Sequence, residues 1–259
     1  MQEKLFQNAK NFYDGQFREK VYATGADQEI RRAEVKSQLE QIGWEEARVL
    51  EVGCGRGQLQ DAAPGYIGCD ISRESGRYLT KPFVCGVAEA LPFADQSFDM
   101  VMSFTVLEHL VCPETALTEI SRVLKKGGRL LLLAAWRVPP WRSLGLEVRN
   151  YEDLGVREKI LKFCLPLFNL LWMKAIFRVP LRALRELRFH ALKKIDCLPY
   201  TRMVPNWECF LLPDSDATAS IDNHACALWL YARGFQSPAV KTSLRRILLP
   251  CGPLMMTKA

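Results

Sequence analysis

Three glycines at alternate positions follow an apolar segment in the first quarter of the chain. Residues 49–57 read V-L-E-V-G-C-G-R-G, which places Gly53, Gly55 and Gly57 directly after a predicted strand. Glycine lacks a Cβ, so such a turn can bend tightly and bring the backbone close to a ligand. A dinucleotide fingerprint would require its third glycine where Gln58 stands. The spacing therefore disfavours a dinucleotide and indicates another polar ligand.

Two acidic residues stand beside this turn. Glu51 lies in the strand before the glycines, and Asp70 ends the next apolar segment. The carboxyl ends of parallel strands border the crevice in which α/β sheets bind ligands. The alternative is that both acids only cap structural elements and the glycines only form a turn.

The elements that must position these residues alternate along the chain. Alternating strands and helices imply right-handed crossovers and a parallel sheet. Helices are predicted over residues 27–43, 58–63, 113–124 and 222–233, and strands over 48–52, 66–70, 83–87, 98–104, 129–135, 239–243 and 254–258. The strand at 98–104 is apolar on both faces, as a central parallel strand requires.

Four later motifs extend the pattern at characteristic spacing. After the glycine turn and Asp70 come residues 86–93 (G-V-A-E-A-L-P-F), 97–99 (S-F-D), 106–110 (V-L-E-H-L) and 120–128 (I-S-R-V-L-K-K-G-G). Together they resemble the methyltransferase type 11 group of class I enzymes dependent on S-adenosyl-L-methionine (SAM). That group includes the ubiquinone and menaquinone methyltransferases. The resemblance implies an α/β fold, with a doubly wound, Rossmann-like, seven-stranded sheet and a helical insertion after the fifth strand.

The resemblance also implies which residues bind the cofactor. Asp70 would hold the ribose hydroxyls, Glu51 the ammonium group, and the amides of the glycine turn the carboxylate, helped by the positive end of the following helix. The family often has Asp where this chain has Val87, so adenine recognition would use the backbone near Ala88 and the side chain of Glu89. The full predicted set is Glu51, Gly53, Cys54, Gly55, Gly57, Asp70, Ile71, Ala88, Glu89 and Phe104.

Methyl transfer to a hydroxyl acceptor requires positioning and a base that removes the proton. The chain has three histidines. His109 follows the strand at 98–104 on the ligand side of the sheet, and we take it as the leading candidate, with Glu108 beside it as a weaker one. His224, in the first turn of a late helix, is the second candidate, although acids before that helix are also ordinary caps. His190 lies among arginines and is predicted to be on the surface.

A long basic segment follows the fifth strand. Residues 137–202 hold fourteen Lys or Arg and six Asp or Glu, whereas the whole chain has a net charge of +6. Residues 160–177 are mostly apolar but contain Lys162, Pro166 and Lys174, which disfavours a transmembrane span. Residues 178–194 alternate arginines with leucines, as in a helix that lies on an anionic membrane surface. The alternative is a substrate lid that packs its leucines on the domain and leaves its arginines solvated.

Composition sets the remaining expectations. The first twenty residues lack an apolar run, and nine cysteines without a Cys-x-x-Cys pair indicate reduced thiols and no metal site. We therefore expect a cytoplasmic protein that can attach peripherally to the inner face of the membrane. The predicted parts are a helical segment (1–45), the cofactor-binding core (46–135), a basic cap (136–212) and the last helix and strands (213–259).

The favoured function is SAM-dependent methylation of a small-molecule, lipid-linked or glycan-linked acceptor, with oxygen as the acceptor atom. One alternative is an RNA methyltransferase that binds through the basic segment. The strand at 98–104 is followed by T-V-L rather than by the Asn/Asp-Pro-Pro-aromatic turn of enzymes that methylate bases, which disfavours nucleic acid. The other alternative is a non-catalytic, methyltransferase-like module at a membrane.

Overall fold

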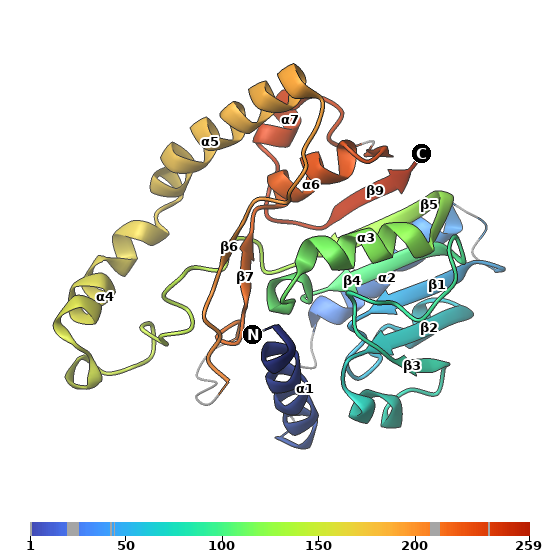
Figure 1. Ribbon diagram of the computed structural model, residues 1–259, viewed down its shortest axis with the longest axis horizontal. Coiled ribbons are helices and arrows are strands. Elements are labelled where there is room, and N and C mark those ends of the chain that lie inside the picture. Colours follow the sequence, from blue (N-terminus) through green and yellow to red (C-terminus); the bar gives the residue numbers. More distant parts are fainter. Residues whose placement is uncertain (1, 20–25, 42, 44, 208–212, 238) are drawn as a thin grey trace. The chain divides into compact units, whose positions relative to one another are not determined.

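The computed structural model describes the chain from residue 2 to 259, apart from residues 20–25, 42, 44, 208–212 and 238. Its main sheet has seven strands in the order β3-β2-β1-β4-β5-β9-β8 (Figure 1). The strands are β1 (Arg48–Val52), β2 (Gly65–Asp70), β3 (Phe83–Cys85), β4 (Phe98–Phe104), β5 (Leu124–Leu133), β8 (Phe235–Gln236) and β9 (Leu254–Lys258). The pairs from β3 to β5 are parallel, and β9 runs antiparallel to β5. The predicted doubly wound, seven-stranded α/β fold is confirmed.

Helices cover both faces of this sheet. In Figure 1, α3 (Pro113–Val123) lies on one face and α2 (Ala26–Glu40) on the other. Proline stands at the start of α3, where its missing N–H costs nothing, and Ala116, Leu117 and Ile120 form the buried stripe. Val35 and Leu39 of α2 belong to the core that contains β1 and β4. A further helix, α1 (Gln2–Glu19), precedes α2.

Three predicted elements differ from the observed ones. The helix expected at 58–63 is only the 3-10 turn η1 (Gln60–Ala62), because the glycine turn uses up the first part of a short connection between two parallel strands. The strand predicted at 129–135 is β5, which begins earlier, at Leu124, and so includes Gly127 and Gly128 at the place where its register against β4 shifts. The strand expected at 239–243 is wrong, because Thr242 caps the short helix α7 (Ser243–Ile247) and the sheet strand is β8.

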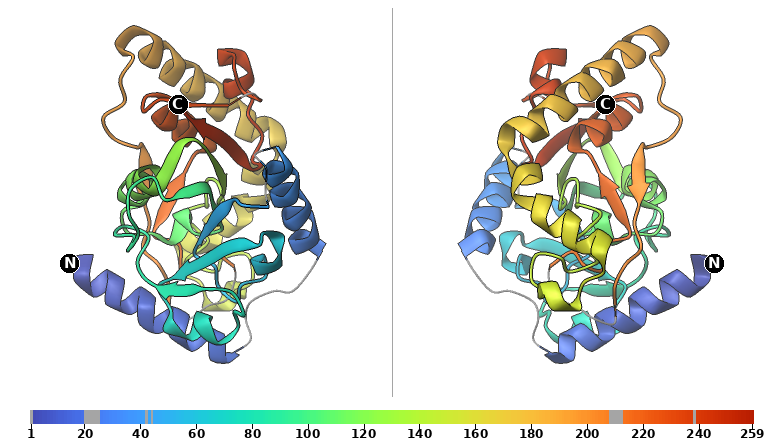
Figure 2. Two further views of the ribbon diagram at one scale, coloured as in Figure 1. Left: turned by 90° about the vertical axis from the view of Figure 1, so that its right-hand side faces the viewer. Right: turned by 90° about the vertical axis from the view of Figure 1, so that its left-hand side faces the viewer.

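The segment after β5 folds around two helices and a hairpin. Helix α4 (Val156–Asn169) and helix α5 (Leu171–Leu192) follow each other with a bend between them (Figure 2). Strands β6 (Tyr200–Arg202) and β7 (Ala219–Ile221) form an antiparallel pair that the sequence did not predict, and α6 (Asn223–Tyr231) follows. Among the described residues, no helix combines the length and the apolar character needed to cross a membrane.

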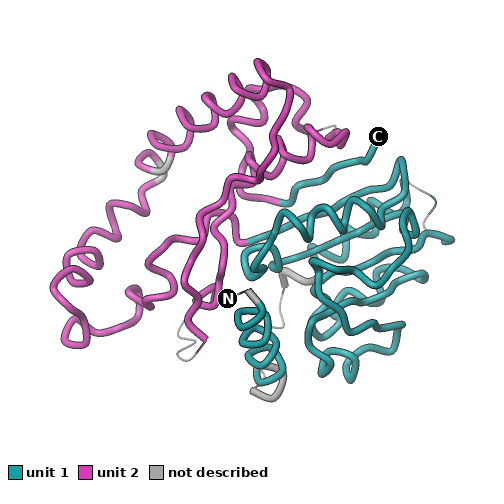
Figure 3. Tube along the Cα trace, viewed as in Figure 1, with its two compact units in different colours: residues 1–134, 253–259 teal, residues 135–252 magenta. Residues whose placement is uncertain are grey.

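The chain divides into two compact units (Figure 3). The first contains residues 1–134 and 253–259 and therefore nearly the whole sheet, and the second contains residues 135–252. The fifth strand ends at this boundary, as expected for an insertion after it. A role of residues 136–212 as a substrate cap stays a prediction.

Candidate cofactor site and candidate bases

The glycine turn after β1 adopts a backbone that side chains disfavour. Gly53, Gly55 and Gly57 have φ of +74°, +51° and +64°, in the left-handed region. A Cβ on Gly53 would lie 2.2 Å from Cγ2 of Val106, and one on Gly57 would lie 2.6 Å from Cγ of Leu79. Both glycines are therefore required by conformation and by packing. The turn is a tight cradle and not a generic loop.

The amides of this turn are used inside the protein. The N–H groups of Gly53 and Cys54 both donate to the Cys69 carbonyl, at 2.8 and 3.1 Å, and that of Gly57 donates to Cys54 at 2.8 Å. These three donors are thus engaged inside the turn, and the expectation that the turn holds a cofactor carboxylate stays a prediction. A three-residue 3-10 turn follows in place of a helix, so the expected positive helix end is absent at this place. Neighbouring backbone groups satisfy these donors because the turn folds back onto the end of β2.

Asp70 fixes the turn from the end of β2. One carboxylate oxygen accepts the Gly55 amide and the other accepts the Ser72 amide, both at 2.9 Å. A carboxylate has about four acceptor positions, so these two bonds leave room for hydrogen bonds from a ligand. The side chain is partly exposed, although burial of the carboxyl raises the pKa of Asp70 above its ordinary value. The residue that the resemblance assigns to the ribose hydroxyls is thus held in place with accepting capacity left over.

Glu51 is a buried carboxyl with one strong partner. Its side chain is 5% exposed, and the Tyr66 hydroxyl donates to Oε2 at 2.5 Å. Burial raises the pKa of Glu51 to about 8, even though the hydrogen bond from Tyr66 acts in the opposite direction. The carboxyl is therefore protonated near neutral pH until a cation reaches it. Such a group fits an ammonium ligand.

Tyr66 is a site residue that the sequence analysis missed. It lies on β2, two positions before Gly68, and Gly68 is the register partner of Glu51 on β1. A Cβ on Gly68 would lie 3.2 Å from the Tyr66 hydroxyl oxygen and 2.9 Å from the Cys54 sulfur. The glycine leaves the room through which Tyr66 reaches Glu51. A glycine opposite a strand carboxylate, with a tyrosine two positions away on the same face, was the available signal.

The other predicted cofactor residues, with Ala88 and Glu89 on the adenine side, lie at or just after the ends of β2, β3 and β4. Ala88 and Phe104 are buried, and the Arg31 guanidinium lies 5.5 Å from the centre of the Phe104 ring. The backbone carbonyl of Ile71 accepts the Cys85 thiol at 3.6 Å. Glu89 accepts the Cys112 amide at 3.4 Å, and burial raises the pKa of its carboxyl. The side chain of Glu89 therefore already has a partner inside the protein.

His109 follows β4 in the 3-10 turn η3 (Leu107–His109). Its Nε2 lies 3.9 Å from Oε1 of Glu108, a buried carboxylate, and its side chain is 15% exposed. The ring also meets Tyr13 of α1 edge to face, with 6.1 Å between ring centres. His109 thus lies just after the carboxyl end of β4, near the Glu108 carboxylate and the Tyr13 ring.

Helix α1 reaches the site at a second point. The hydroxyl of Ser72, just after Asp70, donates to the Asp14 carboxylate, and Asp14 neighbours Tyr13 on α1. The helix also contacts η2 (Arg73–Arg77), the turn after β2. The sequence analysis gave α1 no role in the site, because only the tertiary contacts bring it to the ends of β2 and β4.

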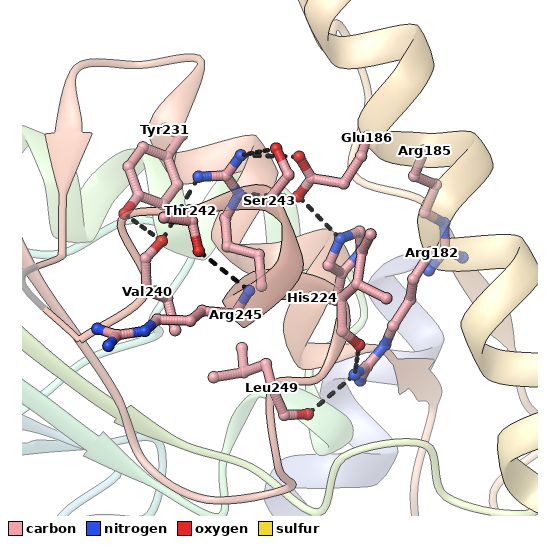
Figure 4. Close-up of polar contacts among 12 residues, drawn as sticks. Arg182, Arg185, Glu186, His224, Tyr231, Val240, Thr242, Ser243, Arg245 and Leu249 are labelled. Carbon is pink, nitrogen blue, oxygen red and sulfur yellow. Dashed lines mark hydrogen bonds and ion pairs between the residues drawn. The ribbon is translucent and has the colours of Figure 1, made fainter.

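His224 lies in a buried polar cluster of the second unit (Figure 4). Its side chain is fully buried, its Nε2 lies 3.2 Å from Oε1 of Glu186, and burial lowers its pKa to about 4. Asp222 accepts the His224 amide and caps α6, so the capping alternative is confirmed. A neutral, enclosed imidazole paired with Glu186 favours a structural role over that of a base.

The middle of the chain matches a known family. Residues 50–132 match the family model described as a methyltransferase domain. A demethylmenaquinone methyltransferase of Thermus thermophilus is 33% identical over 147 residues, which are 51% of this chain and 65% of that protein. The malonyl-[acyl-carrier protein] O-methyltransferase of Herminiimonas arsenicoxydans is 40% identical over 94 residues, 32% of this chain and 35% of that protein.

A solved structure also matches only part of the chain. The YcgJ protein of Bacillus subtilis is 30% identical, with a TM-score of 0.36 over 39% of this chain and 50% of that chain. By sequence, the match to the same uncharacterized methyltransferase covers 49% of this chain and 51% of that protein, at 33% identity. The chain thus spans about half the length of the curated relatives it matches.

Proposed function

Because residues 50–132 form a methyltransferase domain of the predicted family, we propose that the protein is a SAM-dependent methyltransferase. One observation supports this most directly. Two adjacent parallel strands end in held carboxyls around a glycine cradle, Asp70 fixed by the Gly55 amide and Glu51 by Tyr66. Asp70 would accept hydrogen bonds from the two ribose hydroxyls of SAM. Glu51, on the neighbouring strand, would pair with the ammonium group of its amino acid part.

The chain's own residues would bind and orient the reactants. When bound, SAM supplies a methyl group on a positively charged sulfur. Asp70 would accept the ribose hydroxyls, and Glu51 would lose its proton as the cofactor's ammonium group approaches. His109, at the end of β4, would take the proton of a hydroxyl acceptor, with Glu108 near its ring. Positioning is the main contribution, since the displacement must be in line.

For the acceptor we propose a small molecule or a lipid- or glycan-linked group, with transfer to oxygen. The relatives named for demethylmenaquinone and for malonyl-[acyl-carrier protein] support this class. A lipid-linked acceptor requires access to a membrane, so we keep a cytoplasmic protein with peripheral attachment through residues 178–194. Methylation of RNA and a non-catalytic role are the alternatives. Incubation with radiolabelled SAM and fractionated extract would separate them by label in a small-molecule or lipid fraction, in RNA, or in none.

The cofactor site is tested by Asp70→Ala. Loss of hydrogen bonds to a charged acceptor should weaken SAM binding by about 1.5–3 kcal/mol, or about 10- to 150-fold. Isothermal titration calorimetry with SAM measures this, and circular dichroism checks that the variant is folded. Asp61→Ala, which removes an exposed acid near the same turn, is the matched control and should bind like the wild type. Equal affinity in Asp70→Ala and the wild type would refute the site.

A further inference from the structure

Helix α5 turns its charges toward its own unit. Arg182, Arg185 and Glu186 lie at helical spacing on one side, with Arg182 and Glu186 almost fully buried. Arg182 donates to both Asp222 oxygens, at 2.6 and 3.3 Å, and Arg185 donates to the same carboxylate at 2.9 Å. Figure 4 shows these side chains pointing from α5 toward α6. The expected lid, with packed leucines and solvated arginines, is wrong for these residues.

The opposite side of α5 is apolar and exposed. Ile176, Leu184 and Leu187 are 56%, 45% and 68% exposed, and their spacing places them on one stripe with Pro180. The helix cannot turn this stripe inward, because that rotation would pull Arg182 and Glu186 from their buried partners. Separating a buried ion pair costs several kcal/mol. The stripe is therefore fixed facing away from the unit's own packing.

Helix α4 carries a stripe of the same kind. Val156, Ile160 and Phe163 are 77%, 60% and 78% exposed and lie at spacing i, i+4 and i+7. The opposite side holds Leu165, which packs in a small core with Leu154. We call the exposed stripes of the two helices the outer apolar face. Exposed apolar surface on this scale marks a site that binds a protein or a membrane.

The exposed charged residues within the two helices are basic, whereas the acids Glu152 and Asp153 are exposed in the turn before α4. Arg157, Lys159, Arg188 and Lys193 are exposed on or next to the two helices. By sequence each helix has one acid, and both acids are turned to partners: Glu158 bonds the Gly155 amide, and Glu186 pairs with Arg246. A second copy of the chain would bring like charges together at this face. An anionic surface complements them, because basic residues near it are attracted to the lipid charges.

We infer that the outer apolar face docks on an anionic lipid surface, with its apolar side chains entering the headgroup region and its basic residues meeting the lipid charges. This deepens the proposed function, because it names the surface on which a lipid-linked acceptor would be reached, and it rests on that function only for the identity of the acceptor. It also changes which residues of α5 are expected to contact the membrane. Arg182 and Arg185 do not reach the lipid, and Ile176, Leu184 and Leu187 do.

Vesicle co-sedimentation tests the inference with the full chain. The probe is a vesicle of equal parts phosphatidylglycerol and phosphatidylcholine. The double variant Ile176→Glu/Leu187→Glu should bind at least tenfold more weakly, because two new carboxylates would enter the headgroup region. Leu244→Glu, at a leucine of α7 that is 65% exposed and lies outside the face, is the matched control and should bind like the wild type. Arg188→Gln/Lys193→Gln should remove most of the preference for anionic over neutral vesicles.

Several results would contradict the inference, and each can be told apart from the others. Wild-type protein that stays in the supernatant with anionic vesicles at low salt overturns the inference, as does equal loss in Leu244→Glu. Sedimentation velocity adds a second readout: a wild-type dimer that the double variant converts to a monomer would assign the face to a second copy instead. SAM titration of the same samples separates the two proposals. Vesicle binding without SAM binding would refute the cofactor site and leave the lipid face standing, and the reverse would refute the lipid face alone.

Discussion

The most unusual single group in the cofactor site is the Glu51 carboxyl. An acid at the end of a central strand is buried by the sheet on both sides, and the Tyr66 hydroxyl gives it one hydrogen bond. The unfolded chain exposes the same carboxyl to water. The proton that Glu51 holds is therefore a property of the fold, and it can be measured without any ligand.

Glu51→Gln should reduce the pH dependence of stability. The pKa of Glu51 rises from 4.5 to about 8 on folding because of burial. The stabilisation from this proton is complete below pH 4.5 and is lost as the pH rises through 8. In this range the free energy of unfolding of the wild type should fall relative to the variant by up to about 1.4 kcal/mol per pH unit. Urea unfolding of both proteins across the range measures it, and parallel curves would contradict it.

His109→Gln tests the proposed base. Glutamine keeps a polar side chain at the end of β4 but cannot take a proton, so turnover with a hydroxyl acceptor should fall at least tenfold. SAM affinity should stay nearly unchanged, because the cofactor contacts proposed here are made by Glu51 and Asp70. His190→Gln, at an exposed histidine of α5, is the control and should leave turnover intact. Full activity in His109→Gln would remove the histidine from the mechanism.

At the scale of elements, α5 buries charged side chains and exposes apolar ones, which is the opposite of the usual amphipathic helix. Burial would raise the pKa of Asp222, but hydrogen bonds and charge from Arg182 outweigh it and hold the pKa below its ordinary value. Glu186 likewise has a lowered pKa, since the Arg246 guanidinium offsets its burial. The cluster decides which side of the helix faces inward. Leu184 and Leu187 of the same helix are 45% and 68% exposed.

Arg182→Ala should therefore destabilise the protein strongly. Its removal leaves Asp222 buried beside only partly buried cations, a change that costs about 3–5 kcal/mol in other proteins. Arg188→Ala, one turn and a half further along the exposed side, should change stability by less than about 0.5 kcal/mol. Denaturant unfolding of the two variants compares them directly. Equal effects would mean that the buried pair does not hold the helix.

At the scale of the whole molecule, the chain divides into a unit that holds the glycine turn and a unit that is basic. The residues proposed to bind the cofactor all lie in the first unit, and the excess of positive charge lies in the second. Such a division suits an enzyme that keeps its cofactor chemistry on a rigid sheet and assigns its acceptor or its membrane contact to an insertion. The strands of the first unit, β1 to β5 and β9, lie outside residues 136–212.

Local patterns determined most of the sheet. The strand at 98–104 and the one at 254–258 have the predicted bounds. The first is an apolar run between turns, as expected for a central strand of a parallel sheet. The glycine turn and Asp70 were predicted from spacing, since a positive φ and a strand-end carboxylate depend on neighbours along the chain. The sequence also indicated the methyltransferase family.

Only the tertiary structure decided the features that depend on distant partners. The Tyr66 hydroxyl reaches Glu51 because Gly68 leaves space across two strands, and Tyr13 reaches His109 because α1 folds back to the site. Of the two alternatives for α5, the structure contradicts the lid with packed leucines and solvated arginines, because Arg182 is buried and Leu187 is 68% exposed, whereas membrane contact stays a prediction. A helix pattern gives two faces but does not say which is buried, and Asp222, forty residues after Arg182, settles that choice. Free energy from a buried ion pair, and not hydrophobicity alone, places those arginines inside.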